Sequence, residues 1–323
     1  MKFRIPKNKT TEFIRETAHG FSADKVLKLA AALAYSTLFA LPALLIIILW
    51  ISSAFYSPSR TEANVMLQMN TLMGEEAATQ VREILVNTKF DYTGLWAKIL
   101  GIVILSVSAT SVFGEIQDSI NTIWGLQAKP RTGVVKIFIN RLLSFSIILS
   151  LGFILVVSLI ANALISTLSD NVQLHFPWIP VGLYYVLNQL VMALILLLLF
   201  GTIFKVLPDA KIAWRDIFFS ATITTALFMG GKYLIEYVLG HNATISVYGS
   251  AGAVIVILLW VYYSSIILYL GAEMTQVWIK LKGRKIQPNK YAVWVEKRNI
   301  QVASNTDIQK DNDPAKESQT RVA

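Results

Sequence analysis

The sequence has no cysteine and only three histidines, and both scarcities exclude chemistry. Without cysteine the chain has no disulfide, no thiolate nucleophile and no thiolate metal site. The histidines lie far apart, and none has a metal-binding spacing such as HExxH. We therefore expect no metal site and no cofactor. Charged residues are also few: they make up 15% of the 323 residues, against about 25% in soluble domains.

Apolar sequence takes the place of the missing charge. Hydrophobic residues make up 54% of the chain, and the mean hydropathy is +0.54. Six apolar segments are long enough to cross a hydrocarbon core of about 30 Å. They lie near residues 29–54, 95–115, 142–166, 182–204, 216–239 and 249–273. This pattern predicts an all-α integral membrane protein with six transmembrane helices.

Basic residues are distributed unevenly between the connections. Seven Lys/Arg precede the first span, four lie in 125–141, three in 205–215 and ten from residue 280 onward. The connections 57–94, 169–181 and 240–248 hold three, none and none. Because basic loops stay in the cytoplasm, both termini should be cytoplasmic. The net charge of +9 then reflects topology, and we expect no nucleic-acid partner.

The chain divides into three predicted parts. Residues 1–28 form a cytoplasmic amphipathic segment, whose stretch from Thr11 to Lys28 should lie on the inner membrane surface. Residues 29–280 form the membrane domain, with a helical, amphipathic outer loop over 57–94. Residues 281–323 form a tail that is basic at first and then disordered from Ser304. We expect anionic lipid headgroups to contact its membrane-proximal basic residues, which are Lys280, Lys282, Arg284 and Lys285. A homo-oligomer is left open.

Polar residues inside the fifth span fall on one helical stripe. Thr222, Thr225, Lys232 and Glu236 lie within about 80° of one another at 100° per residue. Polar groups at membrane depth cost free energy unless they are paired or face water. Lys232 and Glu236 either line a polar cavity or form a pair near the outer headgroups, toward which Lys232 snorkels.

The second and sixth spans carry stripes of the same kind. The second runs from Ser108 through Glu115 and Asp118, where a solvated helix end is an equally simple interpretation. In the sixth span the stripe ends at Glu273, near the cytoplasmic boundary. The small residues Gly249, Gly252 and Ala253 at its outer end favour helix packing. The candidate substrate-binding residues are Lys232, Glu236, Asn162, Asn188, Glu115, Asp118, Tyr262, Tyr269 and Glu273.

Four stretches resemble the YihY/BrkB family of bacterial inner-membrane proteins. They are AALAYSTLFALPALLIII (31–48), IQDSINTIWGL (116–126), GKYLIEYVLG (231–240) and YGSAGAVIVILLWVYYSSIILYLGAEMT (248–275). The resemblance covers about 10 to 285. It implies six spanning helices, cytoplasmic ends and a multi-pass location in the bacterial inner membrane. The role of the family is unsettled: members have carried a ribonuclease BN label or have been linked to virulence, serum resistance and transport of envelope lipids.

The residues themselves favour transport over catalysis. Phosphodiester hydrolysis would need a bound metal or an acid and base facing aqueous substrate, and the sequence offers neither pattern. We therefore expect no enzyme. The favoured interpretation is a transporter or translocator of lipid or another amphipathic envelope substrate through a polar intramembrane cavity. The alternative is a non-transporting membrane scaffold for envelope assembly or virulence-related functions.

Overall fold

The chain is seen here as a computed structural model, which describes residues 7–53, 111–128, 181–240, 250–289 and 292–295. It also describes residues 66, 70, 75, 78–80 and 82. Helices predominate in these ranges. They are α1 (Lys7–Ala23), α2 (Val26–Ser53), α7 (Val181–Val206), α8 (Trp214–Gly240) and α10 (Ser250–Leu281). Residues 111–123 are also helical.

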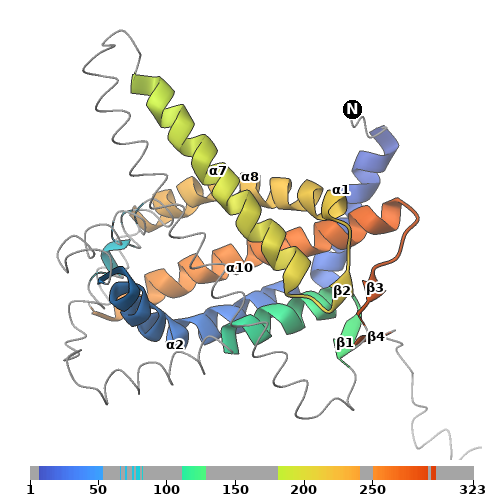
Figure 1. Cartoon of the computed structure of the whole chain (residues 1–323), viewed down its shortest axis with the longest axis horizontal. Helices are drawn as coiled ribbons and strands as arrows, with labels where there is room; N and C mark the ends of the chain where they lie inside the picture. Colours follow the sequence, from blue (N-terminus) through green and yellow to red (C-terminus); the bar gives the residue numbers. More distant parts are fainter. Residues whose placement is uncertain are drawn as a thin grey trace, which may run out of the picture.

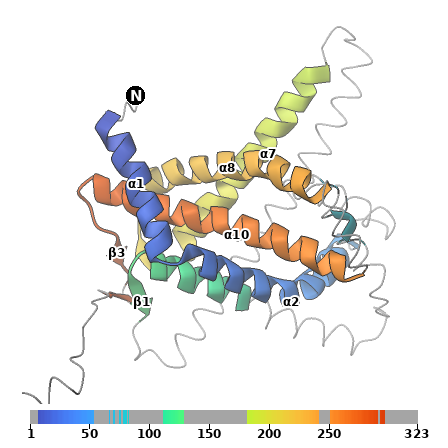
Figure 2. The ribbon, with the colours of Figure 1, turned by 180° about the vertical axis from the view of Figure 1, so that it is seen from behind.

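Helix α10 is the centre of the described structure. It lies between α2 and α8 and packs against both, while α7 crosses the layer obliquely and contacts α8 (Figure 1). Viewed from behind, α1 lies across the C-terminal end of α10 (Figure 2). The short strands lie at this same end, which we call the α1 end of the bundle. By the charge distribution above, the α1 end should face the cytoplasm.

The helix bounds agree with four of the predicted spans to within a few residues, except at the end of α10. The described helices α7, α8 and α10 contain segments long and apolar enough to cross a membrane, which supports an all-α membrane protein. Helix α10 continues to Leu281, beyond the predicted span end at 273. The predicted span 142–166 lies outside the described residues, as does 95–115 up to residue 110. The number of six spans and the side of the termini therefore stay predictions.

Two glycines allow the central helices to approach closely. A Cβ atom at Gly271 of α10 would meet Thr224 of α8 and would lie 2.7 Å from the Phe204 ring of α7. A Cβ atom at Gly231 of α8 would collide with the hydroxyl of Tyr263 on α10. Small residues at such contacts let helices gain van der Waals packing where the lipid supplies no hydrophobic driving force.

The N-terminal segment forms a helix, which ends before Lys28. The stretch from Thr11 to Lys28 is not one helix, because α1 ends at Ala23 and Lys25 adopts a left-handed conformation with φ of 55°. The apolar face of α1 does not depend on lipid alone: Phe13 is buried against Val277 and Trp278 of α10. Protein contact thus replaces part of the expected membrane contact, because the long C-terminal extension of α10 offers an apolar partner.

Two antiparallel strand pairs were not expected from the sequence. Strand β1 (Leu126–Ala128) pairs with β4 (Ala292–Trp294), and β2 (Ala210–Lys211) pairs with β3 (Gln287–Pro288). The start of the predicted tail therefore folds back onto the membrane domain. Residues 296–323, including the predicted disorder from Ser304, lie outside the described residues.

The predicted outer loop is described at only a few positions. Those positions are helical, as predicted, and Ala78 is buried in a cluster with Val256 and Ile257 of α10.

Candidate functional site

The polar stripe of α10 becomes more buried toward the α1 end. Tyr262 is partly buried, while Ser265 is 3% exposed and both Tyr269 and Glu273 are fully buried. The Ser265 hydroxyl donates to the Val261 carbonyl, so it is satisfied within its own helix. The buried Tyr269 hydroxyl and Glu273 carboxyl face neighbouring helices.

Glu273 lies against α1. A Cβ atom on Gly20 would lie 2.6 Å from Glu273 Oε2, so a larger residue here would force the carboxyl group to shift. Thr17, one turn earlier on α1, is also buried. Helix α1 thereby covers a carboxyl group that sequence spacing puts at the cytoplasmic boundary. Burial of a carboxylate is costly, which makes this position a candidate for function.

Tyr269 faces the helical residues 111–123. Its hydroxyl lies close to that of Ser119, and it interacts electrostatically with Glu115. Neither hydroxyl has a hydrogen bond of standard geometry. The structure therefore brings Glu115, Tyr269 and Glu273 to one region, whereas Asp118 is exposed. Of the two predicted stripes, Glu115 and Tyr269 are the residues that this interaction brings together.

Two hydrogen bonds hold this region together. Trp124 Nε1 donates to the Ala272 carbonyl at 2.9 Å, and Gln276 Nε2 donates to the Ile123 carbonyl at 2.7 Å. One acceptor is the carbonyl of Ile123 at the end of the helical residues 111–123, and the other is the carbonyl of Ala272 inside α10, so the two bonds fix the register between these helices. Trp124 is itself buried at this contact.

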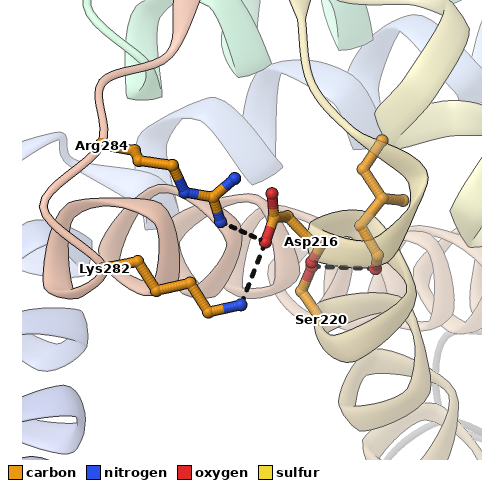
Figure 3. Close-up of polar contacts among 5 residues, drawn as sticks. Asp216, Ser220, Lys282 and Arg284 are labelled. Atoms are coloured by element: carbon orange, nitrogen blue, oxygen red, sulfur yellow. Dashed lines mark hydrogen bonds and ion pairs between the residues drawn. The ribbon is translucent and has the colours of Figure 1, made fainter.

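A buried charge cluster at the start of α8 was missed by sequence reasoning. Asp216 is 2% exposed and accepts from Arg284 Nη2 at 2.6 Å and from Lys282 Nζ at 3.1 Å (Figure 3). The carboxylate beside Arg284 raises the pKa of its guanidinium above the usual value. In sequence Asp216 resembles a helix-start residue facing solvent, and nothing near it indicates partners 66 and 68 positions later.

A second missed contact joins the motif 116–126 to the loop between α7 and α8. Asn121 Nδ2 donates to Asp209 Oδ2 at 3.1 Å, and the Asp209 N–H donates back to Asn121 Oδ1 at 2.9 Å. The Asp209 carbonyl also accepts from the Asn289 N–H at 2.8 Å. Three segments that are far apart in the sequence thus meet at Asp209, which binds Asn121 through side-chain contacts and Asn289 through a backbone hydrogen bond.

The basic residues in the last turn of α10 and just after it are largely engaged within the protein. Lys280 pairs with Glu16 of α1 at 3.0 Å, and this partner lowers the pKa of the Glu16 carboxyl. Lys282 and Arg284 hold Asp216, and Lys285 lies 5.3 Å from the centroid of the Trp294 ring. The tail residues that we expected at lipid headgroups therefore have additional structural roles.

Lys232, the outer candidate whose side chain the structure describes, is not brought to the same region. Lys232 is partly exposed on α8, with Nζ 5.6 Å from the Tyr233 ring centroid. Glu236 and Asn188 lie on α8 and α7, and Gly252 is buried on α10 beside Ala253. Asn162 and Gly249 lie outside the described residues, as do the side chains of Glu236, Asn188 and Ala253.

Helix contacts show how far apart the two regions are. Thr275 donates to Ser220 at 2.6 Å, and Tyr263 donates to the Leu227 carbonyl at 3.4 Å. These contacts put Lys232 of α8 near the level of Tyr262 of α10. Tyr262 and Glu273 are separated by about 16 Å along the axis of α10. Lys232 and Glu273 thus lie at two depths of the bundle.

Comparisons with known proteins agree with the family resemblance. The sequence profile described as Virulence factor BrkB matches residues 17–292. A UPF0761 membrane protein of Pseudomonas aeruginosa is 28% identical over 273 residues, covering 83% of this chain and 62% of that protein. One from Chromobacterium violaceum is 28% identical over 270 residues, covering 81% and 61%. One from Xanthomonas campestris is 26% identical over 278 residues, covering 82% and 60%.

The chain thus spans about 60% of the length of these curated relatives. No solved structure matches it. The profile match covers well over half of the sequence and includes every helix described above except the first residues of α1. The chain therefore belongs to the BrkB family, whose curated relatives here are named as membrane proteins.

Proposed function

We propose that this membrane protein is a transporter or translocator of an anionic amphipathic envelope substrate, such as a lipid, in the bacterial inner membrane. The observation that carries the proposal is the fully buried pair Tyr269 and Glu273 on a helix long enough to span the membrane. Ionisable groups at such positions are rare because they are costly, and they often mark substrate or ion pathways.

Charged side chains lie at two depths of the bundle, which supports a path for substrate across the membrane rather than a single binding site. Lys232 lies toward the predicted outer end, and the acidic group of Glu115 and Glu273 lies toward the α1 end. A substrate with an anionic headgroup would be attracted by Lys232 and would meet polar side chains of α10 as it moved inward. We assign no catalytic residue in this proposal.

The proposal is tested by measuring movement of labelled anionic lipid in proteoliposomes that contain the full chain. We expect Lys232→Met to lower the rate about 10- to 100-fold, since a hydrogen bond to a charged group contributes about 1.5–3 kcal/mol. Glu273→Gln keeps the side-chain volume and should also slow movement. The control is Thr222→Val, which changes an exposed residue of α8 that bonds only to the Phe218 carbonyl.

Wild-type rates in both Lys232→Met and Glu273→Gln would remove the proposed path. A stable partner recovered with the chain, together with no movement of any lipid by the purified protein, would favour the scaffold. The α1 end of the bundle supports that second candidate, because its strand pairs and the Asn121–Asp209 contact form a fixed surface there.

A further inference from the structure

One basic surface at the α1 end is built from two distant segments. Lys205, Lys211 and Arg215 come from the end of α7, the loop and the start of α8, and Arg284 and Lys285 follow α10. Four of the five are exposed, and Lys205 is partly buried. We call this set the α7–α8 basic surface. The acidic residues in the same segments are Asp209, bound to Asn121, and Asp216, which is buried.

The fold holds the two segments in contact. Strand β2 pairs Lys211 with Gln287 of β3, which places the chain after Lys285 beside the loop. Asp216 binds Arg284 through one guanidinium nitrogen. Since a guanidinium has five N–H donors, this ion pair orients Arg284 while leaving donors for a further anion. The surface is thus held by backbone pairing and by a buried carboxylate.

An exposed aromatic residue indicates the depth of this surface. Trp214 is 59% exposed and begins an exposed row on α8 that continues through Phe218 and Thr222. This row lies on a helix long and apolar enough to span a membrane, where exposed apolar side chains are expected to contact lipid. The Lys205 ammonium lies 5.9 Å from the centroid of the Trp214 ring. Tryptophan beside basic residues is typical of the headgroup level.

We propose that the α7–α8 basic surface binds the phosphate of an anionic glycerophospholipid in the cytoplasmic leaflet. Arginine donors match phosphate oxygens, and the exposed Trp214 and Phe218 contact the adjoining chains of the lipid. The site differs from the basic tail alone, because Lys280 is paired with Glu16 and Lys282 is largely buried against Asp216. Binding at this surface does not require the transport proposed above.

Native mass spectrometry of the purified full chain tests the site with an equimolar mixture of phosphatidylglycerol and phosphatidylcholine. Wild-type protein should retain phosphatidylglycerol preferentially. Each surface charge contributes about fivefold to anionic lipid binding, so Lys211→Gln with Arg215→Gln should weaken phosphatidylglycerol binding about thirtyfold. Retention of phosphatidylcholine should not change. The matched control is Lys9→Gln with Lys28→Gln, which removes the same charge from exposed positions on α1 and α2.

Equal losses in the two double variants would mean diffuse attraction and would overturn the site, as would unchanged retention in both. If excess inorganic phosphate displaced phosphatidylglycerol and was itself found bound, the ligand of this surface would be a soluble phosphate compound, and the lipid proposal would be wrong. Lys211→Arg with Arg215→Lys keeps both charges and should retain the lipid; loss of binding there would also contradict the proposal. No outcome depends on lipid movement, so failure here is distinct from failure of transport.

Discussion

At the scale of single residues, two neighbouring glycines of α8 have opposite surroundings. The Tyr263 hydroxyl occupies the space where a Cβ atom of Gly231 would be, while nothing lies within 4 Å of such an atom at Gly230. Tyr263 donates to the Leu227 carbonyl from this position, so its ring is seated on the backbone of α8. The close approach of α8 and α10 therefore depends on glycine at residue 231 and not at residue 230.

This difference predicts the effect of alanine at each position. Helix propensity favours alanine over glycine equally at both, by about 1 kcal/mol. Overpacking against Tyr263 adds a cost of about 1–3 kcal/mol only at residue 231. Gly231→Ala should therefore be less stable than Gly230→Ala by that amount, measured by unfolding of the detergent-purified protein.

A second substitution checks the cause. Tyr263→Phe removes the colliding hydroxyl, so in that background the difference between the two alanine variants should shrink. An unchanged difference would assign the cost to something other than the Tyr263 contact, and equal stability of both alanine variants would contradict the predicted collision.

At the scale of elements, α1 is held to α10 by three kinds of contact. Trp278 stacks on Phe219 with ring centroids 3.8 Å apart, and Phe13 meets both rings edge-on. The Glu16–Lys280 ion pair adds an exposed link, and Gly20 admits the Glu273 carboxyl. Because the ion pair is exposed, the aromatic packing contributes more to docking. Helix α1 is thus a fixed cover of the buried carboxyl at this end.

A crosslink tests whether α1 docks in the membrane-embedded protein. The absence of cysteine means that two introduced cysteines are the only thiols. Cysteines replacing Glu16 and Lys280 should be joined efficiently by a short bismaleimide, because the native side chains meet at 3.0 Å. A protease site introduced between the two helices lets the link be detected, because the cleaved fragments of a crosslinked chain stay together in a denaturing gel.

The matched control pairs Lys280→Cys with Ile14→Cys. Ile14 is exposed and lies about 200° around α1 from Glu16, so it should crosslink poorly. Equal crosslinking of both pairs would indicate that α1 rolls or detaches, as the original expectation of a helix lying on the membrane surface allowed.

The aqueous pH dependence of the ion pair has a defined sign. Lys280 lowers the pKa of Glu16, so the pair stabilises docking above the ordinary carboxyl pKa, and this contribution is lost as pH falls through the lowered value. The aromatic contacts do not titrate. In the protein that keeps Glu16 and Lys280, docking of α1 should therefore weaken in acid without disappearing. The measurement is hydrogen-exchange protection of the α1 amides, corrected for the intrinsic pH dependence of exchange.

At the scale of the whole molecule, the sequence predicted what depends on local periodicity. Hydropathy located α2, α7, α8 and α10, and 100° spacing identified Tyr269 and Glu273 as neighbours on one face. The positions of Glu115, Asp118 and Glu273 in their spans also predicted that these three acids lie toward the inner side. In the structure Glu115 interacts with Tyr269 and Glu273 is buried one turn further along α10, whereas Asp118 is exposed. Residue spacing is enough to predict which side chains share a helix face, because each residue of an α-helix turns the side-chain direction by about 100°.

Features that depend on distant partners could not be predicted in this way. Asp216 depends on Lys282 and Arg284, which follow it by more than 60 residues, and Asn121 depends on Asp209. The burial of Glu273 depends on α1 docking at Gly20. Each case requires the relative placement of helices, which hydrophobic pattern alone does not specify, and the strand pairs are too short to show a period.

The arrangement of the whole chain across the membrane predicts a pattern of labelling. Lys9, Lys285 and Glu75 are exposed residues of α1, the segment after α10 and the predicted outer loop. Single cysteines at Lys9 and Lys285 should react with a membrane-impermeant maleimide only in inverted vesicles, and one at Glu75 only in intact spheroplasts. The predicted topology requires that Lys9→Cys and Lys285→Cys react from one side of the membrane and that Glu75→Cys reacts from the other. If Glu75→Cys reacted from the same side as Lys9→Cys, the chain would have to cross the membrane an even number of times between them. That result would contradict the single crossing between these positions, which the basic N-terminal segment and the length of α2 predict.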